Sequence, residues 1–370
     1  MDDIIMKKKQ PLDKIFLGVT ILLALVGLFV FTSASFGLFA RRGFSLQDLL
    51  FDQVILGLFV GVIIATIVTF KVPLKFLQKN ALYFFIGSIV ISFFVFFPGV
   101  GLEHGGAKRW IDLGIISFQP SEILKLGTII YFAALLPLFK ERIGTLKYAL
   151  WVTLGILFFP ALILLSEPDT GTFAVLFASI VAMLLAAGMK IRHFLLIIVV
   201  SIFAVGLLAI ARPYVGERIL TYLDPSHDPQ GASYQIQKSM LAIGSGGITG
   251  RGFGQSIQKF GSLPEPTGDS IFAVVGEEFG FIGGAIIIVL FLLFGVRGIQ
   301  IAGRAPDMFG SLLAVGIVIL IVSQSFANIA AMLGLIPLTG VPLVFVSHGG
   351  TALLFAFLEI GIMLNISKLR

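Results

Sequence analysis

Asp269 has the most unusual context of any acidic residue in the chain, because it stands where a polar segment meets an apolar one. It follows Leu-Pro-Glu-Pro-Thr-Gly (263–268) and precedes an apolar stretch from 270 to 276. Moving a charged side chain towards hydrocarbon costs at least about 2.5 kcal/mol. The residue can cap the first N–H groups of a helix, or it can accept a proton from an attacking hydroxyl.

Glu277 and Glu278 follow deeper in the same apolar segment. Consecutive residues of a helix point about 100° apart, so these two cannot both share the direction of Asp269. We expect one of them to pair with a basic residue.

A basic pair, Lys108 and Arg109, precedes Trp110. Such residues can sit at the level of the lipid headgroups, where tryptophan is also common. Alternatively, they can clamp a pyrophosphate, because arginine offers two parallel donors to phosphate oxygens. Both interpretations remain open.

The sequence Gln119-Pro120-Ser121-Glu122 predicts the start of a helix, since proline favours the first helical position and an acid stabilises the first turn. Lys125 lies three residues beyond Glu122, so the two side chains can pair on one helix face. A lysine inside a membrane helix is costly, which indicates a functional role.

Glu167-Pro168-Asp169 also has the pattern of a helix N-terminus. Alternatively, the two carboxylates can hold a magnesium-like cation, which typically uses one or two carboxylates plus substrate phosphates. His348 has no partner at metal-ligand spacing, so we interpret it as structural.

The elements that must position these residues are membrane helices. The chain is 57% apolar and 12% charged, with a mean hydropathy of +1.04, whereas soluble domains carry about 25% charged residues. We predict a polytopic, all-α membrane protein with about ten spans of roughly 20 residues each. The apolar segments are 14–35, 51–70, 81–100, 119–138, 149–165, 170–188, 193–211, 270–297, 309–335 and 345–366.

We expect one integral-membrane domain over residues 1–370, with a single large loop at 212–268. Within that loop, 234–243 has helical spacing and places Ile236, Met240 and Ile243 on one side. Lys and Arg gather in the other loops, so the positive-inside rule places both termini in the cytoplasm. The polar clusters then share the outer side.

Several functions are disfavoured by what the sequence lacks. It has no Gly-x-x-x-x-Gly-Lys-Ser/Thr motif for nucleotide phosphates, no clustered basic face for nucleic acid, and no cysteine for disulfides or thiolate chemistry. A reaction on the outer side without a nucleotide needs a substrate that carries its own activation. A lipid-linked pyrophosphate sugar is such a substrate.

Taken together, the clusters resemble the SEDS family, the RodA and FtsW proteins of bacterial wall elongation and division. The resemblance covers nearly the whole chain, and its Ser-x-Gly-Gly-Thr ending favours the FtsW-like branch. The motifs that carry it are Lys108-Arg109-Trp110, Gln119-Pro-Ser-Glu122 with Lys125, Pro168-Asp169, Leu263-Pro-Glu265 with Asp269, Gly276-Glu-Glu278, Pro337-Leu-Thr-Gly340, and Ser347 with Gly349-Gly350.

The resemblance implies a peptidoglycan glycosyltransferase in the bacterial plasma membrane that polymerises lipid II together with a single-span, class B penicillin-binding transpeptidase. It implies that Asp269 is the general base on the 4-hydroxyl of the acceptor N-acetylglucosamine, with undecaprenyl pyrophosphate leaving and the configuration inverting. A divalent cation, Mg²⁺ or Mn²⁺, at Glu167 and Asp169 is expected to offset charge on the pyrophosphate. The expected substrate-binding residues are Lys108, Arg109, Gln119, Ser121, Glu122, Lys125, Glu265, Thr267, Glu277, Glu278 and Ser347.

Three sites depart from the family pattern: the pair Thr267-Gly268 replaces the frequent His-Thr, His348 replaces the frequent Tyr, and Glu167 replaces the frequent Gln. We expect Glu167 to strengthen cation binding. The rival functions are a flippase for lipid-linked precursors, since ten helices with intramembrane charges suit a transporter, and a non-catalytic scaffold for the transpeptidase.

Overall fold

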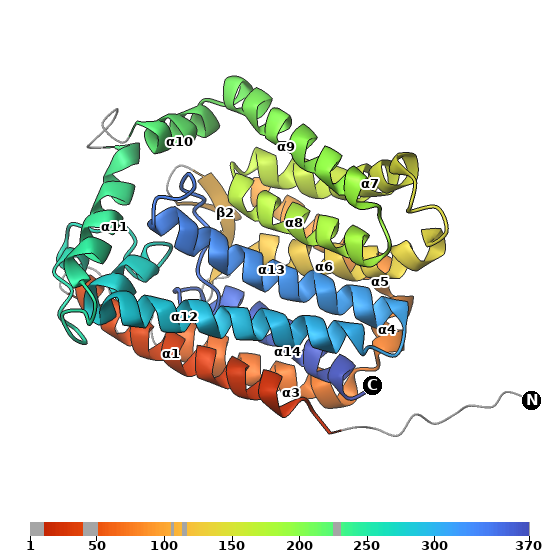
Figure 1. Ribbon diagram of the computed structural model, residues 1–370, viewed down its shortest axis with the longest axis horizontal. Helices are drawn as coiled ribbons and strands as arrows, with labels where there is room; N and C mark the ends of the chain where they lie inside the picture. Colours follow the sequence, from red (N-terminus) through yellow and green to blue (C-terminus); the bar gives the residue numbers. More distant parts are fainter. Residues whose placement is uncertain (1–10, 40–50, 105–106, 113–116, 225–230, 370) are drawn as a thin grey trace, which may run out of the picture.

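The computed structural model describes residues 11–39, 51–104, 107–112, 117–224 and 231–369, and Figure 1 shows a bundle of long helices. Within these residues, eight helical segments are long and apolar enough to cross a membrane, and two shorter apolar helices, α5 and α8, accompany them. The ten predicted apolar segments are thus all found in helices.

The long segments are α1 (Lys14–Phe39), η1 (Phe51–Val60) continuing into α3 (Gly61–Lys71), α6 (Pro120–Leu135) continuing into η3 (Leu136–Phe139), α7 (Leu146–Ser166), α9 (Ile191–Ala211), α12 (Ile271–Gly303), α13 (Met308–Met332) and α14 (Gly350–Ser367).

Two boundaries differ from the prediction. The final helix, α14, begins at Gly350 and not at 345, because Phe345 (φ 67°) and Gly349 (φ 154°) have backbone angles that no right-handed helix contains. The segment predicted at 81–100 ends earlier, as α5 (Ala81–Phe93) and η2 (Phe94–Phe96). The short helix α4 (Leu74–Lys79) precedes α5, and α8 covers Thr170–Ala186.

The predicted all-α membrane fold is confirmed, and the one addition to it in the described residues is a small antiparallel sheet after η2. Its strands are β1 (Gly101–His104), β2 (Ala107–Asp112) and β3 (Ser117–Phe118), in the order β1-β2-β3. Leu102 pairs with Trp110, and Ile111 pairs with Phe118. The basic pair 108–109 therefore lies on the central strand.

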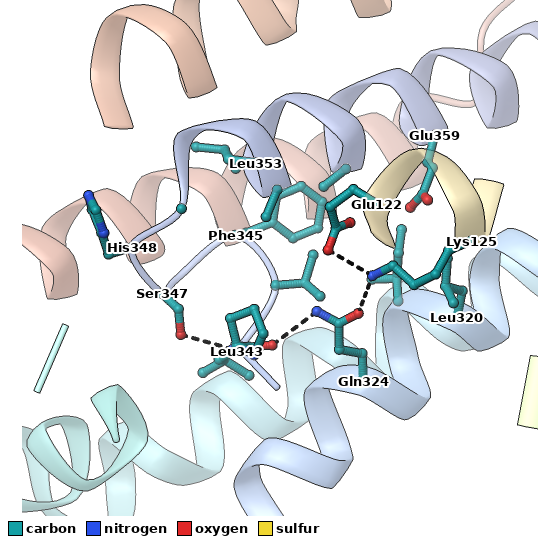
Figure 2. Close-up of a pocket in the computed structure, with 16 residues that line it drawn as sticks. Glu122, Lys125, Leu320, Gln324, Leu343, Phe345, Ser347, His348, Leu353 and Glu359 are labelled. Atoms are coloured by element: carbon teal, nitrogen blue, oxygen red, sulfur yellow. Dashed lines mark hydrogen bonds and ion pairs between the residues drawn. The ribbon is translucent and has the colours of Figure 1, made fainter. Parts of the chain in front are cut away.

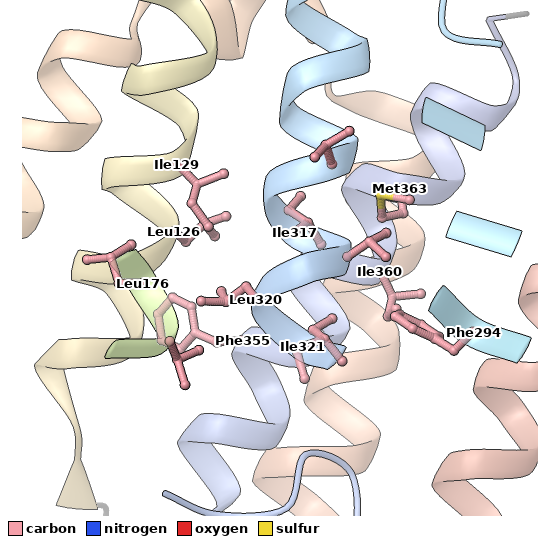
Figure 3. Close-up of a cluster of buried hydrophobic side chains, with 14 of the residues drawn as sticks. Leu126, Ile129, Leu176, Phe294, Ile317, Leu320, Ile321, Phe355, Ile360 and Met363 are labelled. Atoms are coloured by element: carbon pink, nitrogen blue, oxygen red, sulfur yellow. The ribbon is translucent and has the colours of Figure 1, made fainter. Parts of the chain in front are cut away.

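Helix α13 is central to the hydrophobic core (Figure 3). In the central part of α13, 72% of the residues are buried by other parts of the protein. Its side chains Ile317, Leu320 and Ile321 lie between residues of α6 and of α14, such as Ile129 and Ile360. This packing fixes the helices that carry the polar clusters.

The segment predicted as one large loop contains α10 (Pro213–Leu223), α11 (Ala232–Gly246) and η4 (Gln258–Phe260). In Figure 1, α9 and α10 run along the edge of the bundle towards α11 at its end. Only 6% of the central part of α9 is buried, as suits a helix that faces lipid.

Helix α11 confirms the predicted helix, and of the three apolar residues expected on one side Ile236 is buried, Ile243 is partly buried and Met240 faces outward. Met240 is 51% exposed, whereas Ser239 and Ala242 are completely buried. The buried face uses small residues because the backbones of α11 and α12 approach closely: a Cβ at Gly246 would lie 1.9 Å from the carbonyl oxygen of Gly276.

Helix α12 is interrupted at Gly280, whose φ of 62° and ψ of −159° are not helical. The N–H groups of Phe281 and Ile282 donate to the carbonyls of Gly247 and Ile248 at 2.9 and 3.1 Å. The loop after α11 therefore supplies main-chain bonds that the helix lacks, and residues 271–279 form a separate first segment of α12.

Candidate active site

Asp269 lies on a tight turn just before α12. The carbonyl of Glu265, a residue with φ 44°, accepts hydrogen bonds from the N–H groups of Gly268 and Ser270 at 3.0 and 3.2 Å. This turn makes Ser270 the N-cap of α12, and no side chain caps the helix there. The capping interpretation of Asp269 was therefore wrong, and its carboxylate is available for another role.

Gln235 of α11 holds the Asp269 carboxylate. Its side-chain Nε2 donates to Asp269 Oδ1 at 2.8 Å and to Ser270 Oγ at 2.9 Å. Asn328 of α13 donates to the Asp269 main-chain carbonyl at 2.7 Å. Two helices thus fix the position of one carboxyl group.

The loop between α13 and α14 supports the Asp269 turn from a third direction. Ser347 Oγ donates to the carbonyl of Gly268 at 2.7 Å, and the His348 N–H donates to that of Thr267 at 2.7 Å. The His348 ring stacks on Phe31 of α1 at 5.7 Å. Ser347 and Thr267, two predicted substrate-binding residues, accordingly position the turn.

Asp269 is closely surrounded by protein atoms, but part of its surface remains accessible to solvent. Burial raises its pKa from the usual 3.8 to about 6, and the negative charge of Glu265 adds to the rise. The hydrogen bond from Gln235 and the positive charge of Arg218 act in the opposite direction. A carboxyl with a pKa near 6 is ionised at neutral pH and is a stronger base than an ordinary aspartate.

Arg109, Glu167 and Asp169 come together at one place. Arg109 Nε donates to the Glu167 carbonyl at 3.0 Å, and its Nη2 donates to the Pro168 carbonyl. Asp169 caps α8 as predicted, accepting from the Thr172 N–H at 3.2 Å. The strand β2 therefore contacts the turn between α7 and α8.

Glu167 is almost fully buried, and its Oε1 has no hydrogen-bond partner among the described residues. Burial raises its pKa to about 8; the charge of Asp169 adds to this, and Arg109 opposes it. A carboxyl in this state retains a proton at neutral pH unless a cation replaces it. No group of three or more potential metal ligands occurs in the described part of the chain, so these two carboxylates alone would need further ligands.

A second polar cluster lies inside the bundle (Figure 2). Lys125 Nζ donates to Glu122 Oε1 at 3.0 Å, which confirms the predicted pair, and to Gln324 Oε1 of α13 at 2.8 Å. These side chains line a small cavity, together with Ser347 and, on α14, Glu359. Because Ser347 also contacts the Asp269 turn, the cavity borders that turn.

The structure places Glu277 and Glu278 in a separate network. Both are fully buried. Glu277 accepts from Ser256 Oγ at 2.6 Å and lies 3.6 Å from Arg251, while Glu278 pairs with Lys259. Both acids, and not one, thus pair with basic residues, and they fasten the segment before η4 to α12.

The remaining predicted residues are dispersed. Lys108 is exposed on β2, Gln119 precedes α6 without capping it by its side chain, and Ser121 is buried with an unpartnered Oγ in the described structure. None of the three is brought to Asp269 by a hydrogen bond described above.

Sequence reasoning missed Gln235, Asn328, Arg218, Gln324 and Glu359. Gln324 and Asn328 are four residues apart within an apolar segment and therefore share a helix face. Glu359 is an ionisable residue in another apolar segment, and such a residue usually marks a functional site. Gln235 and Arg218 carry no such signal, since they belong to the polar loop region.

The family model for cell cycle proteins of the FtsW, RodA and SpoVE type matches residues 13–370. The chain belongs to the FtsW/RodA/SpoVE family. It is 37% identical to stage V sporulation protein E of Bacillus subtilis, over 98% of both chains. It is 35% identical to a probable peptidoglycan glycosyltransferase FtsW of Geobacter sp. (strain M18), again over 98% of both chains.

A chain of a peptidoglycan synthase complex, described as coordinating polymerization and crosslinking, superposes with a TM-score of 0.74 and 26% identity. It covers 95% of this chain and 97% of the other. The FtsW/RodA/SpoVE fold is thus shared over almost the whole length. The resemblance drawn from the motifs is confirmed, as is the assignment as a multi-pass membrane protein.

Proposed function

We propose that this family member is a peptidoglycan glycosyltransferase that polymerises glycan strands from lipid II during wall synthesis. The observation that carries the proposal is the Asp269 carboxyl, which is fixed by Gln235 and has a pKa raised to about 6. A flippase has no need of a base with these properties. The names of the FtsW relative and of the synthase complex support the same reaction.

In the proposed reaction, Asp269 accepts the proton of the 4-hydroxyl of the acceptor N-acetylglucosamine. Gln235 occupies Oδ1, so Oδ2 faces the hydroxyl. The acceptor oxygen forms a bond to the anomeric carbon of the donor N-acetylmuramic acid as the bond from that carbon to the pyrophosphate breaks. Undecaprenyl pyrophosphate leaves with the electron pair, and the α linkage becomes β.

Charge on the leaving pyrophosphate requires cations nearby. Arg109 can contribute its guanidinium, and Glu167 with Asp169 suits a divalent cation: both are hard oxygen ligands, and Glu167 Oε1 lacks a partner among the described residues. Substrate phosphates and water would complete the shell. Bound there, Mg²⁺ or Mn²⁺ would supply electrostatic stabilisation of the pyrophosphate.

We propose that the end of the bundle with α10 and α11 faces the outside of the plasma membrane and that both termini are cytoplasmic. The distribution of Lys and Arg supports this orientation. We further propose a single-span, class B penicillin-binding transpeptidase as partner, which is supported by the match to a complex that couples polymerization to crosslinking.

The test supplies the purified protein and its transpeptidase partner, in vesicles, with labelled lipid II. We expect glycan strands from the wild-type protein and strand formation slower by at least about 10²-fold from Asp269→Asn. A parallel assay measures transfer of lipid II between leaflets. Transfer by the wild type without any strand formation would favour the flippase and overturn the proposal.

The rate of polymerisation should fall on the acid side as pH decreases through about 6, since protonated Asp269 cannot act as a base. The Glu265→Gln variant removes a negative charge that raises this pKa. Its acid limb should therefore move to lower pH. The measurement is the initial rate between pH 5 and 8. An unmoved acid limb in Glu265→Gln would show that another group titrates.

Replacement of Glu167 by Gln should increase the Mg²⁺ concentration needed for half-maximal polymerisation by about tenfold or more. The reason is that the amide cannot supply the second carboxylate. Gln is close to Glu in size, so the turn after α7 should be kept. Unchanged metal dependence in Glu167→Gln would exclude this residue as a ligand.

A further inference from the structure

Arg218 lies on α10, and its guanidinium reaches the loop that follows α13. Its Nη1 donates to the carbonyl of Thr339 at 3.3 Å, and a Cβ at Gly340 would lie 3.6 Å from its Nη2. A second contact ties α10 to the same loop: Tyr222 donates to the carbonyl of Leu335 at 3.0 Å. Two side chains of α10, Arg218 and Tyr222, thus hold this helix against the loop after α13.

A second guanidinium lies close to the first. The Thr339 carbonyl, which accepts from Arg218, lies against Gly171 at the start of α8, where a Cβ would clash with it. The positive charge of Arg109 also lowers the pKa of Arg218, after the larger effect of burial. Arg109 is held on β2 by the carbonyls of residues 167 and 168. Two like charges are therefore kept near one another by main-chain contacts from different elements.

Neither guanidinium is neutralised by an ion pair in the described structure. The ion pairs there involve other basic residues, while Arg109 and Arg218 donate to carbonyl oxygens, which carry no net charge. Two adjacent guanidinium groups without an ion-pair partner can bind an anion that carries more than one charge. Arginine binds phosphate oxygens through paired N–H groups.

The surrounding acids place this pair within the candidate site. Asn328 donates to the carbonyls of Asp269 and Val341 at 2.7 and 2.8 Å, so the loop that accepts from Arg218 is tied to the Asp269 turn. The charges of Asp169 and Asp269 also raise the pKa of Arg218. Arg218 is thus within electrostatic range of the proposed base and of the proposed cation ligand. An anion bound by the two arginines would lie in the region between α8 and the Asp269 turn.

We propose that Arg218 and Arg109 together bind the diphosphate of a polyprenyl-linked donor, with Arg218 providing the second guanidinium that distinguishes a diphosphate from a monophosphate. This inference rests on the proposed function, because it specifies how the glycosyltransferase site binds the diphosphate that leaves during the reaction. It adds α10, a helix outside the core of the bundle, to the substrate-binding elements.

The experiment measures equilibrium binding of labelled undecaprenyl pyrophosphate and undecaprenyl phosphate to the full chain in neutral-lipid nanodiscs. The wild-type protein should prefer the diphosphate. Arg218→Gln should weaken binding of the diphosphate by roughly 10- to 100-fold and should reduce that preference, whereas Arg218→Lys should retain part of the affinity. Arg212→Gln removes the same charge from an exposed neighbouring position and should leave binding close to the wild-type value.

Tyr222→Phe removes the hydrogen bond from α10 to the Leu335 carbonyl without changing the charge. Near-normal diphosphate binding by this variant would show that the weaker binding of Arg218→Gln is not caused by displacement of α10. Equal weakening of both lipids by Arg218→Gln, or an equal effect of Arg212→Gln, would overturn the inference. Nanodiscs containing phosphatidylglycerol test whether the site binds the polyprenyl diphosphate or the phosphate of bilayer lipids. Loss of diphosphate binding in these nanodiscs would assign the site to lipid headgroups and would also overturn the inference.

The binding assay is independent of turnover. If Asp269→Asn polymerised normally, the proposed function would fail while the Arg218 result stood. If strands formed as expected but Arg218→Gln bound the diphosphate like the wild type, only the present inference would fail.

Discussion

Asp269→Asn is expected to reduce the rate of glycan polymerisation by about 10² to 10⁴. The amide has almost the same shape as the carboxyl, and its Oδ1 can still accept the hydrogen bond from Gln235. The variant therefore removes the proton acceptor while retaining the local geometry. Initial rates with labelled lipid II, at a pH well above 6, measure the effect.

The matched control is Glu217→Gln, which makes the same chemical change at an exposed position of α10. It should polymerise at close to the wild-type rate. A comparable loss in both variants would mean that net charge matters and not the base. Normal folding of Asp269→Asn is checked by its elution as a monodisperse protein after heating.

Breaking the ion pair between Lys259 and Glu278 is expected to cause the largest loss of stability, about 3–5 kcal/mol for either partner alone. Both side chains are fully buried, and Lys259 Nζ also donates to the Ser33 carbonyl of α1 at 3.0 Å. Removing one partner leaves an uncompensated buried charge. Lys259→Met and Glu278→Gln should each lower the apparent Tm in detergent by several degrees.

The double variant Lys259→Met with Glu278→Met should be less destabilised than the sum of the single effects, because it leaves neither charge unpaired. Arg251→Met is the control within the same network. Arg251 is 38% exposed and lies 3.6 Å from Glu277, so its removal should cost no more than about 1 kcal/mol. Strictly additive single and double effects would contradict the proposed coupling.

The helices were predictable from the sequence because the bilayer demands long apolar segments, and these are visible without any knowledge of contacts. Short-range pairing was predictable too: Glu122 and Lys125 are three residues apart and do pair. Gln324, the other partner of Lys125, is 199 residues away, and no local pattern connects the two.

The Asp269 turn shows where local patterns mislead. An acid before an apolar run favours a cap, but the carbonyl of Glu265 accepts from both Gly268 and Ser270, which moves the helix start beyond Asp269. The partner that holds the carboxylate, Gln235, comes from α11. Its position depends on how α11 packs against α12, which the spacing of Ile236, Met240 and Ile243 did not specify.

The break at Gly280 has a consequence for depth in the bilayer. All 33 residues of α12 would extend about 50 Å at 1.5 Å per residue, well beyond a hydrocarbon core of about 30 Å. The part after Gly280 is by itself roughly 35 Å long and is sufficient to cross that core. We therefore propose that the first segment, and Asp269 before it, stands at the level of the headgroups. A lipid-borne sugar could reach the carboxylate there while its polyprenyl chain stayed in the membrane.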